Sequence, residues 1–180
     1  MRSTGEVMGI DEDFGLAFAK SQLAAGQVIP LSGGVVFSVK DQDKPPAVAL
    51  AQGYAAEGFQ LYATSGTAKF FREHGLTVIE VYKVREGRPH IIDRLKSHEI
   101  ALLVNTPEGR ETTGDSHSIR HVALEYNIPY TTTMAAARAT LDAIRALRRG
   151  KLEVKSLQEY HRVVGDCQPA CTPPPLRGRG

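Results

Sequence analysis

From Gly34 onward the sequence alternates short apolar runs with segments of helical pattern, and this alternation constrains the fold more than any other feature. The apolar runs are rich in β-branched and aromatic residues and are short, which is typical of buried strands. The expected strands are residues 35–39, 59–63, 78–82, 100–104 and 128–131. The expected helices are residues 44–57, 67–73, 91–96, 116–126 and 134–149.

Strands that alternate with helices at this spacing predict a parallel sheet, because each helical crossover returns the chain to the same edge before the next strand. We therefore expect an α/β fold with a doubly wound, five-stranded parallel sheet and helices on both faces, a Rossmann-like three-layer arrangement. The run at residues 100–104 is the most apolar, so we expect it to be the most central strand. Such folds bind ligands beyond the carboxyl ends of the strands.

The two ends of the chain depart from this pattern. Residues 11–23 predict one amphipathic helix whose apolar side is too small to form a core, so we expect its packing partner to lie outside this sequence. Residues 26–33 predict a linker, and residues 157–162 a last helical turn or two. Residues 163–180 contain four prolines and three glycines and predict a disordered tail. Cys167 and Cys171 lie in this tail and predict free thiols rather than a zinc site.

The composition narrows the class of protein. A hydrophobic content of 42% and a charged content of 23% are ordinary for a globular domain. The formal net charge of +2 argues against a broad nucleic-acid-binding face, which is usually strongly basic. The sequence has no apolar run of about 18 residues, and its first residues lack the apolar stretch of a secretory signal. We expect a cytoplasmic protein without nucleic-acid or membrane partners.

The segments that follow the expected strands are rich in hydroxyls, lysines and glycines, the usual parts of a phosphate site. Residues 64–67 (TSGT) open a helix, so their N–H groups and the helix dipole favour an anion. Lys44 and Lys83 follow neighbouring strands and would add positive charge. Asn105 follows the fourth expected strand and would read a base or sugar edge. The convergence of these groups on one edge of the sheet favours an anion site.

Each of these residues also has a structural interpretation. Thr64 or Thr67 would serve as a helix cap, and Lys44 as a solvated surface residue. The cluster of Lys83, Arg85 and Arg88 would be a solvated charge run, and Asn105 a turn residue.

Catalytic motifs are poorly represented. His90, His98, His117 and His121 occur without the Gly-x-Ser-x-Gly turn of a serine hydrolase, and His74 is expected on the surface. Asp41 and Glu111 lie in the expected binding loops, where a carboxylate would be able to act as an acid or base. Neither a Walker A motif nor Gly-x-Gly-x-x-Gly is present. We expect no catalytic residue, no metal site and no cofactor in this chain itself.

Several strings resemble carbamoyl-phosphate synthase large subunits. Residues 1–9 (MRSTGEVMG) and 18–23 (FAKSQL) look like the end of the second ATP-grasp domain of that family. Residues 64–67, the string KVREGRPH at 83–90, and the pairs Asp93-Arg94 and Asn105-Thr106 resemble the methylglyoxal-synthase-like domain that follows. The resemblance implies an ATP-grasp remnant at residues 1–25, a linker at 26–33 and a regulatory domain at 34–162.

That family makes carbamoyl phosphate from bicarbonate, glutamine-derived ammonia and two ATP, with Mg or Mn, for pyrimidine and arginine synthesis. The resemblance implies that this chain is the regulatory part, which binds UMP or IMP and is also affected by ornithine. It implies as partners a small glutaminase subunit, the remaining large-subunit domains and further copies in a homo-oligomer. The nucleotide-site residues that it implies are Ser38, Lys44, Thr64, Ser65, Gly66, Thr67, Lys83, Asn105, Thr106, Asp115 and Ser116. The ornithine contacts that it implies are Tyr130 and Thr132.

One position departs from the family pattern. Pro107 stands where the regulated members have a threonine that helps to hold the nucleotide, and proline lacks both the hydroxyl and the backbone donor. The change leaves the identity of the effector open.

Two other functional classes remain beside the regulatory interpretation. A methylglyoxal synthase acting on dihydroxyacetone phosphate would use the same phosphate groups. The catalytic Gly-Gly-Asp string of that enzyme reads Gly109-Arg110-Glu111 here, and its His-Asp pair reads Lys40-Asp41, which argues against this alternative. An interaction module for oligomers is compatible with regulation.

Overall fold

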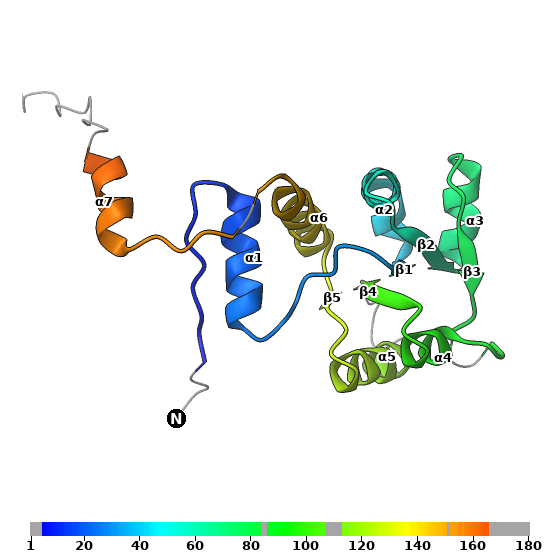
Figure 1. The fold of residues 1–180 in the computed structure, drawn as a ribbon. Helices are drawn as coiled ribbons and strands as arrows, with labels where there is room; N and C mark the ends of the chain where they lie inside the picture. Colours follow the sequence, from blue (N-terminus) through cyan, green and yellow to red (C-terminus); the bar gives the residue numbers. More distant parts are fainter. Residues whose placement is uncertain (1–4, 84–85, 107–112, 151, 166–180) are drawn as a thin grey trace, which may run out of the picture.

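The computed structural model describes residues 5–83, 86–106, 113–150 and 152–165, which form a three-layer α/β fold (Figure 1). The strands are β1 Gly34–Ser38, β2 Gln60–Thr64, β3 Ile79–Val81, β4 Ile100–Asn105 and β5 Tyr130–Thr131. The helices are α1 Phe14–Ala24, η1 Asp41–Asp43, α2 Lys44–Ala56, α3 Ser65–Glu73, α4 Ile91–Lys96, α5 Thr113–Glu125, α6 Met134–Arg149 and α7 Leu157–Gly165. The predicted doubly wound parallel sheet is confirmed.

All strand pairs are parallel, and the order across the sheet is β3-β2-β1-β4-β5. The prediction that residues 100–104 form the most central strand is wrong, because β1 lies in the middle and β4 beside it. Both strands have interior positions and are buried on both faces, so apolar content alone does not distinguish them.

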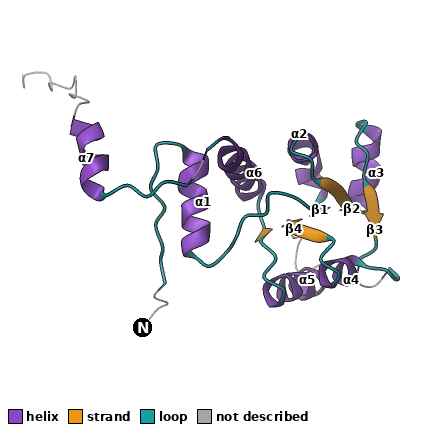
Figure 2. Ribbon diagram, in the orientation of Figure 1, coloured by secondary structure: helices purple, strands orange, loops and turns teal. Residues whose placement is uncertain are grey.

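Side chains alternate between the two faces of the sheet and create two cores. Val35, Phe37 and Val104 pack in the core that also contains residues of α2, α3 and α6. Val36 and Leu103 point to the opposite face and pack in the core that contains residues of α4 and α5. Figure 2 shows these two helical layers on either side of the strands. This arrangement packs α2, α3 and α6 against one face of the sheet and α4 and α5 against the other.

Most element boundaries lie within two residues of the predicted ones. Helices α4 and α6 have the predicted bounds, and Lys44 begins α2 with prolines in its first turn. Helix α5 begins at Thr113, earlier than the predicted residue 116, so Asp115 lies within the helix. The strand β5 is shorter than predicted because only Tyr130 and Thr131 pair with β4.

The first helix has a partner within this chain. α1 packs along α6, as Figure 1 shows, and a Cβ on Gly15 would lie 2.9 Å from the Cβ of Ala146. The expectation that the packing partner lies outside the sequence is therefore wrong for this side of α1. Phe14 and Leu23 of the same helix are exposed.

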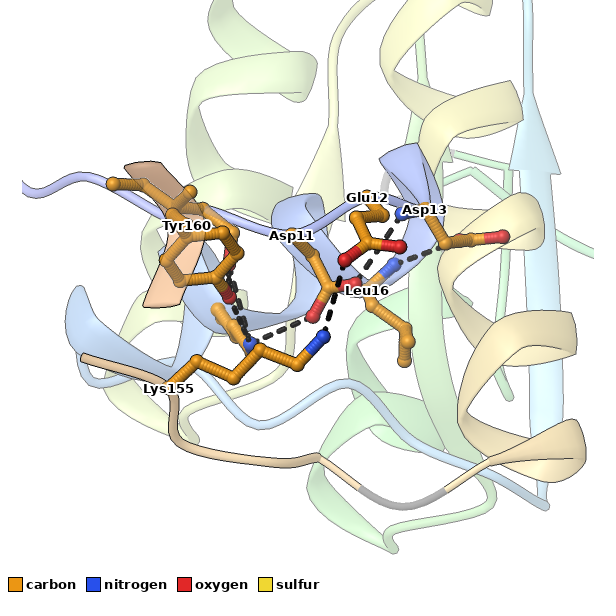
Figure 3. Close-up of polar contacts among 8 residues, drawn as sticks. Asp11, Glu12, Asp13, Leu16, Lys155 and Tyr160 are labelled. Carbon is orange, nitrogen blue, oxygen red and sulfur yellow. Dashed lines mark hydrogen bonds and ion pairs between the residues drawn. The ribbon is translucent and has the colours of Figure 1, made fainter. Parts of the chain in front are cut away.

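The C-terminal helix also differs from expectation. α7 extends to Gly165, so residues 163–165 are helical rather than part of a disordered tail. Tyr160 connects α7 to the first residues of the chain, and Figure 3 shows it near Asp11. The Tyr160 hydroxyl donates 2.9 Å to the carbonyl oxygen of Ile10, and the Lys20 ammonium lies 3.3 Å from the same hydroxyl. Residues 166–180, with Cys167 and Cys171, are outside the described residues.

Candidate anion-binding site

The carboxyl ends of three adjacent strands meet at one edge of the sheet. Ser38 at the end of β1 pairs with Asn105 at the end of β4, and Phe37 pairs with Ala63 just before the end of β2. The chain builds the sheet outward from β1 to β3 and then returns to the other side of β1 as β4. The switch in strand order therefore lies between β1 and β4, where open α/β sheets bind their ligands.

Thr106 fixes the loop after β1 to the end of β4. Its backbone N–H donates to the carbonyl oxygen of Ser38 at 3.1 Å, and its Oγ1 accepts from the backbone N–H of Lys40 at 3.1 Å. Thr106 is buried, so both bonds are shielded from water. The resemblance implied Thr106 as a nucleotide-site residue, which stays a prediction, and the structure shows that its hydroxyl also positions the loop after β1.

Lys44 brings a positive charge to the amino end of α3. A Cβ on Gly66 would lie only 3.4 Å from Nζ of Lys44, so the ammonium lies beside the first turn of α3. Nζ also forms a 2.6 Å ion pair with Oδ1 of Asp41. The Lys44 side chain is 17% exposed, which is inconsistent with the interpretation of Lys44 as a freely solvated surface residue.

The first turn of α3 leaves its amide groups without a side-chain cap. Thr64 occupies the N-cap position but makes no capping hydrogen bond, and its Oγ1 instead lies 3.5 Å from Oγ1 of Thr67. Both threonines are buried, whereas Ser65 and Gly66 reach the surface. An uncapped first turn combines free N–H donors with the positive end of the helix dipole, the combination that binds phosphate.

Asn105 supplies a second observation that favours a ligand. Its side chain is buried, yet Nδ2 has no hydrogen-bond partner among the residues that the structure describes. An unpaired buried amide costs free energy, because it loses its bonds to water without replacement. A ligand acceptor at the switch point would satisfy this donor.

Lys83 follows β3 and is exposed. The pKa of Asp41 is held below its usual value, first by the hydrogen bond from Lys44 and then by the charge of Lys44. The charge of Lys83 makes a smaller contribution in the same direction. Lys83 therefore lies on the same side of the molecule as the loop after β1. Its backbone N–H donates to Oε2 of Glu86 at 3.0 Å, which closes a turn after the strand.

The structure brings together Lys44, Gly66 and Asp41, and the sheet register places Ser38, Thr64 and Asn105 along the same edge. Asp115 and Ser116 belong to α5, but their side chains lie outside the described part of the chain. Arg85, Pro107 and residues 109–111 are also outside it.

The two expected ornithine contacts lie on the outer side of β4. Tyr130 of β5 lines a cavity of about 210 Å³ together with His117, Arg120, His121 and Leu124, and Thr132 follows directly. Two other histidines have structural surroundings. His90 caps α4 through Asp93, and His74 is exposed at the end of α3 as expected.

Sequence reasoning missed two ion pairs near the site. One is Asp41 with Lys44, for which the i,i+3 spacing was an available signal. The other is Arg72 with Glu80 at 2.9 Å, which joins α3 to β3 and which no local spacing indicates. A hydrogen bond from Ser65 also helps to lower the pKa of Glu80, after that from Arg72. Glu80 therefore lies beside the first residue of α3.

In the part of the chain that the structure describes, no group of three or more histidine, cysteine, aspartate or glutamate side chains gathers as a metal site would require. No helix among those residues is long and apolar enough to cross a membrane.

Comparison with known proteins agrees with this geometry. The family model described as MGS-like domain matches residues 46–132, which include α2 from its third residue onward, the first turn of α3 and the ends of β2 and β4. A carbamoyl phosphate synthase large chain from Gemmatimonas aurantiaca is 52% identical over 164 residues, which cover 91% of this chain and 15% of that protein.

Two relatives are shorter proteins. The carbamoyl phosphate synthase large chain, C-terminal section, from Aquifex aeolicus is 46% identical and covers 91% of this chain, which spans 31% of that protein. The C-terminal section from Methanopyrus kandleri is 46% identical over 170 residues, and this chain again spans 31% of it. The chain thus corresponds to less than a third of these relatives.

A solved structure has a similar fold. The methylglyoxal synthase from Elizabethkingia anophelis superposes with a TM-score of 0.53, covering 63% of this chain and 79% of that one, at 19% identity. At this identity the likeness establishes the α/β fold and leaves the activity open.

Proposed function

Because this chain belongs to the family of carbamoyl phosphate synthase large chains and carries their MGS-like domain, we propose that it is the domain through which a nucleotide regulates such a synthase. The ligand would be a nucleoside monophosphate, UMP or IMP, held by its phosphate at the switch point. The observation that carries this proposal is the position of the Lys44 ammonium beside the uncapped first turn of α3.

Each part of the edge has a role in this proposal. The N–H groups at the start of α3 and the ammonium of Lys44 bind phosphate oxygens, and Lys83 adds a second positive charge from the loop after β3. The buried Nδ2 of Asn105, which has no hydrogen-bond partner among the described residues, donates to a base or sugar acceptor. Side chains near Pro107 and Asp115 would then decide between UMP and IMP.

Regulation requires more of the protein than this chain. An effector changes activity only if it binds the active and inactive states of the whole enzyme with different affinities. The ATP sites with Mg or Mn, and the small glutaminase subunit, would belong to the remaining part of the enzyme, and the whole assembly would work in the cytoplasm as a homo-oligomer. In this proposal, ornithine acts separately, at Tyr130 and Thr132.

The proposal is tested by calorimetric titration of the chain with UMP, IMP and dihydroxyacetone phosphate. We expect one nucleotide to bind saturably and Lys44→Met to weaken it at least about tenfold, since a charge-assisted hydrogen bond is worth about 1.5–3 kcal/mol. Lys69→Met is the matched control, because Lys69 is exposed on the same helix α3. Absence of nucleotide binding by a folded chain would refute the proposal. A preference for dihydroxyacetone phosphate would favour a methylglyoxal synthase instead.

A further inference from the structure

The Lys44 ammonium, which is proposed to bind phosphate, already forms an ion pair with a carboxylate of this chain. Nζ of Lys44 lies 2.6 Å from Oδ1 of Asp41, three residues earlier. We infer that Asp41 competes with the phosphate of the ligand for Lys44 and thereby lowers the affinity of the site. This inference rests on the proposed function and concerns the regulation of the same site.

The backbone positions Asp41 for this competition. Asp41 begins the short helix η1, and Lys44 begins α2 directly after it. The preceding residue, Lys40, is fixed to β4 through the hydroxyl of Thr106. The carboxylate is therefore held near the ammonium by the course of the loop as well as by charge.

Exposure indicates which partner moves when a ligand arrives. The Asp41 side chain is 78% exposed, whereas that of Lys44 is 17% exposed. The carboxylate is able to turn toward water with little loss, since exposed ion pairs are worth at most about 1 kcal/mol. The ammonium stays beside Gly66 at the start of α3. A phosphate group would thus replace the carboxylate on a lysine that is already in place.

The charge of Asp41 acts in the same direction. Its pKa is lowered first by the hydrogen bond from Lys44 and then by the charge of Lys44, with a smaller contribution from Lys83. Asp41 is therefore ionised at neutral pH, and its negative charge would repel a phosphate dianion near the same ammonium. Both effects oppose binding until the carboxylate moves away.

Asp43 provides a matched control in the same loop. It carries the same charge two residues later, but its carboxylate faces Lys40, at 3.9 Å, rather than Lys44. Changing either aspartate to asparagine removes one negative charge from the loop and preserves the size of the side chain. Only the change at position 41 releases the ammonium beside α3.

The test is calorimetric titration of the whole chain and of Asp41→Asn and Asp43→Asn with inorganic phosphate and with UMP and IMP. Asp41→Asn should bind phosphate and the nucleotide about three- to fivefold more tightly, the size expected for an exposed ion pair. Asp43→Asn should change either affinity by less than about twofold. In a Lys44→Met background, Asp41→Asn should have no effect, because its proposed target is absent.

The outcomes separate this inference from the proposed function. If the unmodified chain binds a nucleotide and Asp41→Asn binds it no more tightly, the inference is wrong and the proposed function stands. Weaker binding by Asp41→Asn would mean that Asp41 contacts the ligand directly, which also overturns the inference. If none of the proteins binds phosphate or nucleotide, both are wrong.

Discussion

Gly15 of α1 lies against the backbone carbonyl of Asp142 in α6, so closely that a Cβ on Gly15 would stand 2.6 Å from that oxygen. The same Cβ would lie 2.9 Å from the Cβ of Ala146. Small residues at a helix crossing allow the two backbones to approach, and here they join the first helix to the core domain. The segment that resembles an ATP-grasp remnant is therefore packed on the domain that follows it.

Gly15→Ala should separate α1 from α6, because a backbone oxygen is unable to move aside as a flexible side chain would. We expect a loss of about 1–3 kcal/mol in the free energy of unfolding, the usual range for an overpacked contact. Urea denaturation measures this loss. Gly150→Ala is the control, since a Cβ there would meet only the carbonyl oxygen of Ala146, at 3.9 Å. Equal stability of the two variants would contradict the close packing.

Tyr54→Phe should weaken the contact between α2 and α6. The buried Tyr54 hydroxyl donates a 2.8 Å hydrogen bond to the carbonyl oxygen of Ala137, and its loss should cost about 1 kcal/mol. Tyr82→Phe controls for removal of a hydroxyl, because Tyr82 is 46% exposed. Thermal unfolding of both variants at neutral pH would give the comparison, and a larger loss in Tyr82→Phe would contradict this assignment.

The same tyrosine predicts a dependence of stability on pH. Burial, and then the negative charge of Asp142, raise the pKa of Tyr54 in the folded protein. An unfolded tyrosine ionises near about pH 10, so above that pH the unfolded state binds fewer protons than the folded state and stability falls. The stability of the Tyr54→Phe variant should fall less steeply than that of the unmodified protein between about pH 10 and 11. Denaturation midpoints measured across this range would show it, and identical slopes would count against the buried hydroxyl.

The sequence was sufficient to predict the sheet because strand and helix patterns are local. The order of strands was harder: β1 and β4 are both buried on two faces, and their apolar content does not reveal that β1 is the central one. The packing of α1 on α6 depends on Gly15 meeting Asp142, which no local pattern encodes. Helix α1, for which the sequence indicates no packing partner, therefore packs on α6, more than a hundred residues later in the chain.

The candidate site, like the fold, could be predicted only in part from the sequence. The strand-end rule identified Lys44 and the turn at Gly66, because parallel strands bring their carboxyl ends to one edge. It did not reveal that Thr106 holds the loop, because this contact joins residues that are far apart in the sequence. It also did not identify the ion pair of Asp41 with Lys44, although their i,i+3 spacing was an available signal. The roles in binding of all the site residues, Lys44 and Gly66 included, remain predictions for titration to test.

Thr106→Val should weaken ligand binding although valine has the same shape as threonine. The change removes the Oγ1 acceptor and leaves the backbone N–H of Lys40 without its partner, so the loop that carries Lys44 loosens. We expect a stability loss of about 1–2 kcal/mol and several-fold weaker phosphate binding. Thr140→Val is the matched control: Thr140 is also buried, but its hydroxyl donates to Ala136 within α6. Equal binding by both variants would mean that the loop does not need this anchor.

Lys20 of α1 contacts residues 10–11 and Tyr160 of α7. Its ammonium donates to Oδ2 of Asp11 at 2.6 Å and to the carbonyl oxygen of Ile10 at 3.2 Å, and it lies 3.3 Å from the hydroxyl of Tyr160. All three donors of the ammonium therefore have partners. The lysine holds residues 10–11 and α7 together on the surface of α1.

Lys20→Met should release α7 and raise the hydrogen exchange of its backbone amides about five- to tenfold, the effect of losing about 1 kcal/mol locally. Lys155→Met is the control, because Lys155 pairs with Glu12 at 3.2 Å in a more exposed position, where ion pairs contribute little.

The hydrogen bond from Lys20 lowers the pKa of Asp11. The contribution of this pair is therefore present above the ordinary aspartate pKa and is lost as the pH falls through the lowered value. The Tyr160 ring resonances, followed by NMR from neutral pH to about pH 2, should then shift in the unmodified protein and be insensitive to acid in Lys20→Met. If Lys155→Met released α7 as much as Lys20→Met, the hold on this helix would lie in the exposed pair instead.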